Sequence, residues 1–399
     1  MDIDALKAAF SADDAVGVRA LLQKQPTLQA LINQPVGPFD SPAIVNVRSR
    51  EMLDVLLEAG ADINARSRWW AGGFGLLDSA DPGLAAYAIE RGAAVDAHAA
   101  ARLGLLERLR ELVALDPAVV HARGGDGQTP LHFAATTDVA RYLLECGADL
   151  DARDIDHEST PAQHMVKERQ DVARYLVSRG CRTDLLLASA LGDLELARRH
   201  LDANPRCVRM QVDAEWFPTV DRRAGGTIYQ WTLGFHATAP QVARTFGHHD
   251  VLALLLQHTP VEGRLIDACW MADRQAAEAI RREHPGIVET LSEADRRAVA
   301  HAARNNQGDA VRLFLESGWP VDARGQHHAT PLHWAAFHGN ARMTEAILRF
   351  DPPLDATDAD FTSTPLGWAT HGAEHGWYRD TGDYATTSAL LIAAGARRP

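Results

Sequence analysis

Apolar residues along this chain recur in short helical blocks that are separated by polar turns, and the arrangement repeats. The block VARYL at residues 139–143 returns unchanged at residues 172–176, a shift of 33 residues. The blocks carry apolar residues at helical spacing, and several end at a glycine that can adopt the left-handed conformation that closes a helix. These glycines are Gly60, Gly92, Gly147 and Gly180. The pattern predicts an all-α solenoid of stacked helix pairs.

The clearest single unit spans residues 326–358, QHHATPLHWAAFHGNARMTEAILRFDPPLDATD. A polar turn, called the finger below, leads into Thr330-Pro331-Leu332-His333, which opens a small-residue helix. Pro331 suits the first helical turn because its missing N–H would be unsatisfied there, and Thr330 can cap the same turn. A second apolar helix follows. One such unit cannot bury its apolar face, so further copies are expected on either side.

The repeat logic extends over almost the whole chain. We expect about twelve helix pairs, near residues 2–33, 39–66, 67–98, 99–124, 126–154, 156–184, 185–212, 237–260, 261–291, 292–325, 326–358 and 359–399. In four of these pairs a proline replaces the glycine that ends the second helix. They are Pro26, Pro117, Pro205 and Pro285. Proline stops a helix because it has no N–H to donate and restricts the residue before it.

Three segments interrupt the pattern, at residues 67–75, 213–236 and 372–383. They hold five of the nine tryptophans, which are Trp69, Trp70, Trp216, Trp231 and Trp377. Apolar and β-branched residues flank Gly225-Gly226, which predicts a β-hairpin near Thr219 to Leu233. We therefore expect N-terminal repeats over residues 1–212, an inserted hairpin at 213–236 and C-terminal repeats over 237–399, joined as one continuous solenoid.

Composition and charge narrow the partners. The formal net charge of −13 argues against nucleic acid and against an anionic membrane surface, since both require a basic footprint. Cys146, Cys181, Cys207 and Cys269 lie far apart without a CxxC pair, which is typical of reduced thiols. Asp2 and Asp4 stand where a signal peptide carries positive charge, and no apolar run approaches the length of a membrane span. We expect a soluble cytoplasmic protein.

The blocks Thr129 to His132 and Thr330 to His333, with weaker forms at Thr160 and Thr364, resemble the ankyrin-repeat superfamily. The resemblance covers nearly the whole chain and is strong for two or three repeats. It implies a curved stack whose fingers and first helices form a concave surface that binds another protein, and it carries no catalytic residues. The C-terminal TPLGWATHGAEHGWYRDTGDY is also similar to a feature of bacterial ankyrin-repeat proteins of an uncharacterised type.

Several histidines are candidates for a metal site, but a structural role explains them better. The resemblance implies that His132 and His333 tie adjacent turns together through hydrogen bonds. His371 and His375 have the spacing of a metal pair, but Gly372 and Gly376 argue against a continuous helix there. Neither HExxH nor a third ligand at motif spacing is present, so we expect no metal. A Walker loop, a GxGxxG motif and a GxSxG motif are missing as well, so we expect no cofactor.

Two functions remain open. The first is a non-catalytic scaffold that binds a protein or peptide on its concave face. The second is an enzyme or receptor for a small polar metabolite, such as a sugar or carboxylate, in which the inserts roof a pocket. Aromatic side chains are common anchors of ligands, and the planar guanidinium of arginine binds carboxylates and phosphates. The candidate ligand-binding residues are Trp69, Trp70, Trp216, Arg222, Arg223, Tyr229, Trp231, Trp334, His338, Trp368, His375, Trp377 and Asp380. Under the second hypothesis the acids or bases are Glu215, Asp221, His236 and His371. Trp334 and Trp368 fit either the core or the concave surface.

Overall fold

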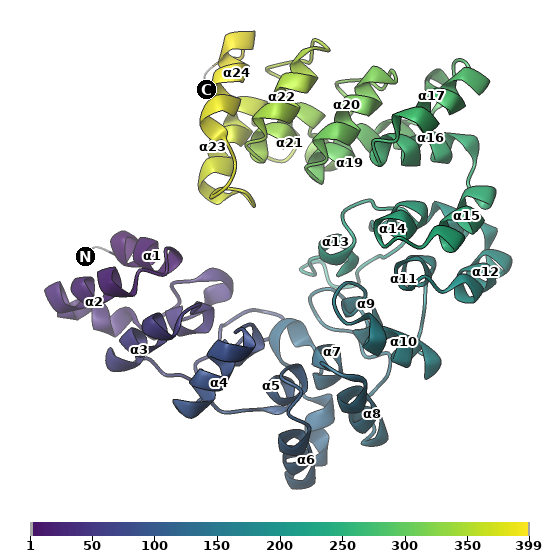
Figure 1. Cartoon of the computed structure of the whole chain (residues 1–399). Helices are drawn as coiled ribbons and strands as arrows, with labels where there is room; N and C mark the ends of the chain where they lie inside the picture. The colour runs from purple at the N-terminus through teal and green to yellow at the C-terminus, as the bar shows by residue number, and fades with distance from the viewer. Residues whose placement is uncertain (1–2, 398–399) are drawn as a thin grey trace. The chain divides into compact units, whose positions relative to one another are not determined.

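The computed structural model describes residues 3–397, and over that range every regular element is a helix (Figure 1). The chain divides into two compact units. The first unit runs up to Thr183 and also takes in Phe217–Thr232. The second unit comprises Asp184–Trp216 and the chain from Leu233 onward.

The first unit is built from short helices, several of which pack against the next helix in the chain. Its α-helices are α1 (Ile3–Ser11), α2 (Ala15–Lys24), α3 (Arg50–Glu58), α4 (Pro82–Glu90), α5 (Ala97–Arg102), α6 (Leu106–Leu115), α7 (Pro130–Phe133), α8 (Thr137–Glu145), α9 (Pro161–His164), α10 (Gln170–Ser178) and α13 (Tyr229–Thr232). Its 3-10 helices are η1 (Pro26–Leu31), η2 (Pro38–Asp40), η3 (Ala43–Asn46), η4 (Leu76–Asp78), η5 (Pro117–His121) and η6 (Gly125–Gly127).

The second unit continues the same construction. Its α-helices are α11 (Leu185–Leu191), α12 (Leu194–Ala203), α14 (Ala239–Thr245), α15 (His249–His258), α16 (Val261–Trp270), α17 (Arg274–Glu283), α18 (Glu293–Arg296), α19 (Ala298–Arg304), α20 (Gly308–Glu316), α21 (Pro331–Phe337), α22 (Ala341–Leu348), α23 (Pro365–His375) and α24 (Tyr384–Ala394). Its 3-10 helices are η7 (Pro205–Arg209), η8 (Val288–Thr290) and η9 (Gln326–His328).

Local chemistry explains where the helices begin and how they pack. Thr330 caps α21 in a reciprocal box with His333, and Asn340 caps α22 by accepting the N–H of Met343. First helices such as α21 carry Ala335 and Ala336 at the interface, so neighbouring helices can approach closely. The buried apolar faces of the C-terminal helices form one continuous core.

The prediction of twelve regular helix pairs is not supported. Before α3 and α4 the structure has the 3-10 turns η3 and η4 instead of a first α-helix. Residues 67–75 replace the expected Thr-Pro-Leu-His block with a glycine-rich loop. Without a proline and a capping threonine at its start, the chain there makes a single 3-10 turn.

The predicted β-hairpin near Thr219 to Leu233 is wrong: among the described residues the segment forms no strand, and its end is the helical turn α13. Part of its backbone bonds to a finger, and its remaining backbone bonds are turns and not a strand ladder. Gly225 donates to the Asp156 carbonyl oxygen at 2.8 Å, and Val220 and Asp221 both donate to the Glu158 carboxylate at 2.8 Å. The finger therefore takes the hydrogen bonds that a partner strand would have made.

The expected break in the helix at Gly372 is also wrong, since α23 runs from Pro365 through Gly372 to His375. Glycine is needed there for packing: a Cβ at Gly372 would lie 2.3 Å from the carbonyl oxygen of Phe337 in α21. The two helices approach each other so closely because glycine removes a side chain from their interface. His371 and His375 consequently share one helix face.

Candidate functional site

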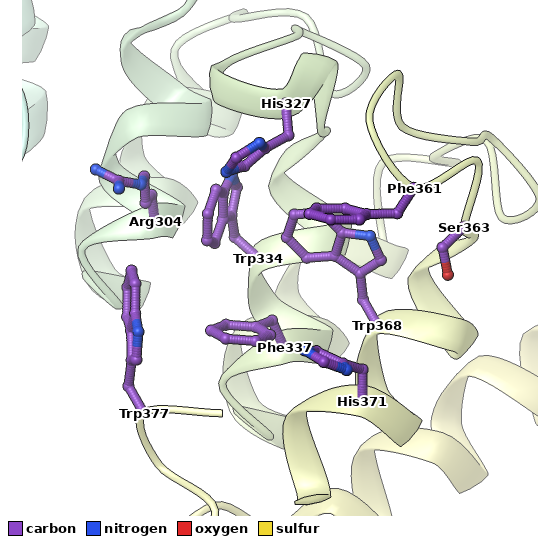
Figure 2. A pocket seen from close by; sticks show the side chains of 9 residues that line it. All are labelled: Arg304, His327, Trp334, Phe337, Phe361, Ser363, Trp368, His371 and Trp377. Carbon is purple, nitrogen blue, oxygen red and sulfur yellow. The ribbon is translucent and has the colours of Figure 1, made fainter. Parts of the chain in front are cut away.

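An open pocket of about 400 Å³ lies in the second unit, where three consecutive repeats adjoin (Figure 2). Its lining comes from the ends of first helices, from fingers and from the loop between α23 and α24. The residues, together called the aromatic pocket, are Arg304, His327, Trp334, Phe337, Phe361, Ser363, Trp368, His371 and Trp377. The volume lies within the range of about 300–1,000 Å³ that is typical of ligand pockets.

The wall of the aromatic pocket is a set of rings in edge-to-face contact. Trp334 meets Trp368 with ring centroids 5.0 Å apart and planes at 86°, and Phe337 meets Trp377 at 5.4 Å and 89°. Trp334 and Trp368 are almost fully buried, whereas Phe361 is 67% exposed and Trp377 is 47% exposed. The sequence allowed Trp334 and Trp368 to be either core residues or part of the concave surface. The structure places both in the core and also in the pocket lining. The exposed rings at its mouth are the ones that a ligand can reach first.

A hydrogen bond fixes the ring of Trp368 in place, whereas the ring of Trp334 has none. The Trp368 indole N–H donates to the Asp358 carboxylate at 2.9 Å, and the same carboxylate accepts backbone N–H groups of its own finger, including that of Ser363 at 3.0 Å. The indole nitrogen of Trp334 is buried and has no hydrogen-bond partner. A buried donor without an acceptor is costly, so the Trp334 indole N–H is an unsatisfied donor next to the pocket.

Arg304 is the most unusual polar residue of the aromatic pocket. It ends α19, its side chain is only 6% exposed, and its Nε and Nη1 atoms are buried without a hydrogen-bond partner. The guanidinium carbon lies 3.2 Å from the Phe235 ring centroid and 5.7 Å from that of Trp377, so aromatic faces supply part of its stabilisation. Burial lowers the pKa of Arg304 to about 9. The residue stays charged at neutral pH.

Two stacked histidines lie beside Arg304. His236 and His301 have ring centroids 3.5 Å apart and planes within 8° of parallel. Burial and then the charge of Arg304 lower the pKa of His236 to about 4, and burial is also the main cause that lowers the pKa of His301. Both rings are therefore neutral at pH 7, and Arg304 carries the positive charge of this cluster.

Other predicted residues of this region lie around the aromatic pocket. The buried His338 bonds through Nε2 to the Arg304 carbonyl oxygen at 2.9 Å and contacts the Tyr378 ring at 5.1 Å. His371 lines the pocket, and the His375 ring lies 5.0 Å from it but is exposed beside Glu374. Asp380 is exposed and pairs with Arg379.

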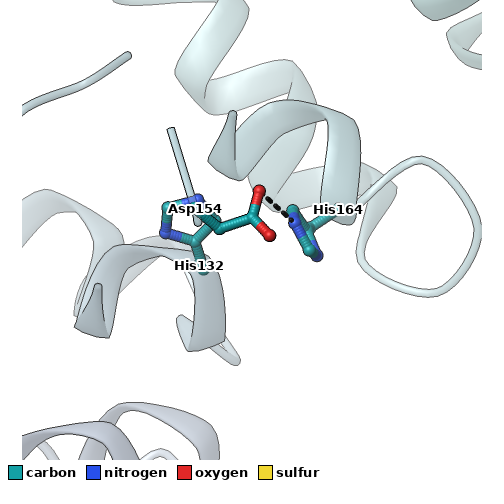
Figure 3. Close-up of side chains that lie close together, drawn as sticks. All are labelled: His132, Asp154 and His164. Atoms are coloured by element: carbon teal, nitrogen blue, oxygen red, sulfur yellow. Dashed lines mark ion pairs between the residues drawn. The ribbon is translucent and has the colours of Figure 1, made fainter. Parts of the chain in front are cut away.

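In the first unit, the buried His132 and Asp154 and the partly buried His164 lie close together (Figure 3). His132 accepts the Thr129 N–H at Nδ1, which places its proton on Nε2, where it donates to the Ser159 carbonyl oxygen at 3.2 Å. Burial lowers the pKa of His132 to about 3. Both ring nitrogens are thus already used, as the predicted structural role requires. The absence of a metal stays a prediction.

A second cluster joins the inserts to the fingers of the first unit. His157 donates from Nδ1 to the Gly226 carbonyl oxygen at 2.9 Å, and its Nε2 lies 3.8 Å from carboxylate oxygens of Asp126 and Asp156. Burial raises the pKa of Asp126 to about 6. The guanidinium carbon of Arg223 lies 4.2 Å above the Trp70 ring. The contacts show that the inserts at 67–75 and 217–232 pack as part of the repeat structure.

The remaining candidates of the inserts fall into two groups. Tyr229 is fully buried and meets Phe217 edge to face at 5.3 Å, so it is a core residue. Trp69 packs against Phe39 at 4.9 Å. Trp231 is 54% exposed, Arg222 is exposed, and Trp216 is half-buried in the second unit.

The proposed acid and base residues have separate surroundings. Asp221 belongs to the first unit, where its pairing with Arg223 lowers its pKa to about 2. Glu215, His236 and His371 belong to the second unit. Glu215 is exposed, His236 stacks on His301, and His371 faces Phe337. Within the described part of the second unit, no hydrogen bond, ion pair or ring contact joins two of Glu215, His236 and His371.

Sequence reasoning missed Arg304, His327, Phe337, Phe361 and Ser363. His327 follows a polar turn and pairs with Asp360 at 2.6 Å, and Phe361 stands in the finger one repeat later. The signal that could have found the aromatic residues among them is the repeat itself. Positions that follow the finger and end the first helix recur every repeat, so a large aromatic residue there faces the same surface as Trp334.

The fold and the finger motifs define a helical repeat protein, and comparisons with known proteins identify the repeat. Residues 97–186 and 275–360 match the family model for ankyrin repeats (3 copies). These two segments, which together make up less than half of the chain, are therefore similar to ankyrin repeats. Within the described residues, every helix is too short or too polar to cross a bilayer.

Known relatives share only part of this chain. Palmitoyltransferase Hip14 of Drosophila melanogaster is 34% identical over 86 residues, which is 22% of this chain and 12% of that protein. E3 ubiquitin-protein ligase XB3 of Oryza sativa subsp. japonica is 33% identical over 85 residues, or 21% of this chain and 19% of that protein. Serine/threonine-protein kinase VIK of Arabidopsis thaliana is 49% identical over 49 residues, or 12% and 11%.

The chain therefore covers less than a fifth of the length of each of these relatives. Among solved structures, the human ASB11 ankyrin repeat domain aligns with 68% of this chain and 100% of that chain, at 16% identity and a TM-score of 0.28.

Proposed function

We propose that this chain is a non-catalytic ankyrin-repeat scaffold that binds a protein or peptide segment at the aromatic pocket. One observation carries the proposal. The pocket is lined by the fingers and the ends of the first helices, which is the surface that ankyrin repeats present to partners, and exposed Phe361 and Trp377 stand at its mouth. Tryptophan and other aromatic residues are the commonest anchors of binding energy at protein interfaces.

The cell compartment of the scaffold and the extent of its repeats are also proposed. The four cysteines are free thiols, which fits a reducing compartment, so we propose a cytoplasmic protein of the bacterial ankyrin type that its C-terminal sequence resembles. We also propose that ankyrin-type repeats extend beyond residues 97–186 and 275–360 to the helix pairs on either side.

Selection from a random peptide library displayed on phage tests the proposed function. Wild-type protein should enrich a family of related peptides. The double variant Phe361→Ala/Trp377→Ala should not enrich that family, because it lacks both rings at the mouth of the pocket. Trp231→Ala is the matched control, since it removes an exposed tryptophan outside the pocket. Equal enrichment on all three proteins would contradict the proposal.

A receptor for a small organic molecule is the second candidate function. The volume of about 400 Å³ favours it, because that space suits a metabolite with a flat apolar body as well as one or two side chains of a peptide. A small ligand that saturates the pocket while no peptide is selected would decide for this function.

A further inference from the structure

The aromatic pocket contains a charge for which the protein supplies no counter-charge. Arg304 takes part in none of the ion pairs found among residues 3–397, and burial is the one cause behind its lowered pKa. Buried charges are ordinarily paired, because leaving water costs a lone ion several kcal/mol. Phe235 at 3.2 Å offsets part of that cost as a cation–π contact.

The residues around Arg304 provide a further hydrogen-bond donor but no negatively charged acceptor. His236 and His301 stack next to it and are neutral at pH 7. Trp334 contributes a buried indole N–H without a partner. A guanidinium and an indole N–H at one pocket can both donate to an oxyanion, and a carboxylate matches the planar fork of arginine.

We infer that the segment bound in the aromatic pocket carries a single carboxylate, which pairs with Arg304, next to an aromatic or large aliphatic side chain, which the rings enclose. This inference rests on the proposed function. Most of the lining is aromatic, so a ligand must bring apolar surface together with its charge. The net charge of −13 acts against a polyacidic segment, because the whole protein repels it, and so favours one acidic residue in a neutral sequence.

The inference separates two residue types that are similar in shape. Glutamine has the size of glutamate but cannot form a charged pair with a guanidinium. Hydrogen bonds to charged groups are worth more than neutral ones, and the difference grows where water is excluded. The glutamate form of a bound segment should therefore bind roughly ten- to hundredfold more tightly than the glutamine form.

Two fluorescein-labelled peptide pools measure this difference by fluorescence polarisation. Both have a central phenylalanine flanked by degenerate uncharged positions. In one pool glutamate follows the phenylalanine, and in the other glutamine follows it. Wild-type protein should prefer the glutamate pool by roughly ten- to hundredfold. Arg304→Met should abolish the preference for the glutamate pool, while Arg304→Lys should keep part of it.

Each outcome has a defined meaning. Equal binding of both pools to the wild type, or a preference that survives in Arg304→Met, would overturn the carboxylate inference and leave the proposed function standing. If neither pool binds but indole-3-acetate does, and Arg304→Met abolishes its binding, the peptide occupant is wrong and the small-molecule candidate is supported. If nothing binds, both the inference and the proposed function are contradicted. Should Arg304→Met fail to fold by circular dichroism, the wild type and Arg304→Lys decide the question.

Discussion

Two histidines show how single residues hold the fingers of this protein. His333 accepts the Thr330 N–H at Nδ1 and bonds through Nε2 to the Ser363 carbonyl oxygen at 3.1 Å, which belongs to the next finger. His132 repeats the arrangement with Thr129 and Ser159. Each imidazole thus links one repeat to the next and satisfies two backbone groups that would otherwise be buried unpaired.

Replacing His333 by alanine should destabilise the second unit by about 2–4 kcal/mol, because it orphans two backbone groups and leaves a cavity. The measurement is urea denaturation followed by circular dichroism. His375→Ala is the matched control, since His375 is exposed and its loss should change stability by less than about 0.5 kcal/mol. Equal effects of the two substitutions would contradict the structural role.

The second residue-scale prediction concerns Asp267 in α16. Burial raises its pKa to about 7, although hydrogen bonds from Thr238 and Gln241 to its Oδ1 atom, at 2.8 and 2.9 Å, act in the opposite direction. In the unfolded chain the pKa is about 3.9. The folded state therefore holds a proton that the unfolded state has lost, and this contribution to stability is complete below pH 4 and declines until about pH 7.

Asp267→Asn should remove this dependence, because the amide oxygen can accept both hydrogen bonds without a charge. The free energy of unfolding of the variant minus that of the wild type should rise in favour of the variant between pH 4 and pH 7.5, by up to a few kcal/mol, which is the order that such a shift implies. Denaturant titrations across that pH range measure the difference. A difference that stays constant with pH would show that Asp267 titrates normally.

At the scale of elements, the segment 217–232 behaves as part of the first unit. Gly225, Ile228 and Val220 bond to the finger at residues 154–159, and Tyr229 packs beneath with 0% of its surface exposed. An insert that is held by the fold in this way cannot be removed without loss of stability. Deleting the segment is therefore expected to unfold the first unit, which differs from the behaviour of a separate hairpin.

Two substitutions in α13, Tyr229→Ala and Trp231→Ala, test whether the segment 217–232 packs as part of the first unit. Loss of the buried Tyr229 side chain should cost about 3–5 kcal/mol, the usual range for a core aromatic residue. Loss of the Trp231 side chain, which is 54% exposed, should cost less than about 1 kcal/mol. Thermal and urea denaturation provide the comparison. Similar losses for both variants would mean that α13 is not packed as described.

The loop at residues 67–75 requires a glycine at position 72, because the backbone of Gly124 lies close to it. Gly72 has φ +146°, and a Cβ there would lie 2.0 Å from the Gly124 carbonyl oxygen. Gly147 also has positive φ, at +90°, but its Cβ would meet open space. Gly72→Ala should destabilise the first unit by several kcal/mol more than Gly147→Ala, which costs about 1 kcal/mol through backbone strain alone. Equal effects in urea denaturation would show that the loop does not approach Gly124.

Much of the helical architecture could be predicted from the sequence because it depends on local, periodic signals. The shift of 33 residues, the glycine exits and the Thr-Pro-Leu-His blocks each act over a few residues. The same signals could not show that the segment around Gly225-Gly226 forms no hairpin. Its backbone partners lie 60 to 70 residues earlier in the sequence, in a finger. Pattern reasoning sees strand propensity but not which acceptors are already nearby.

At the scale of the whole molecule, each unit has to be considered by itself. Part of the candidate site in the C-terminal repeats could be predicted from the sequence. The pocket is lined by four of the predicted residues, Trp334, Trp368, Trp377 and His371. Arg304 was not predictable. An arginine at the end of an amphipathic helix is usually solvated, and its burial depends on Phe235 and Trp377, which come from distant parts of the sequence.

The affinity of a selected peptide for three forms of the full chain tests the central claim most directly. The account predicts that Trp377→Ala weakens binding at least tenfold, since aromatic anchors at a pocket mouth commonly contribute that much. Trp231→Ala, which lies outside the pocket, should bind like the wild type. Unchanged affinity in Trp377→Ala, or an equal loss in Trp231→Ala, would contradict the assignment of the aromatic pocket as the binding site.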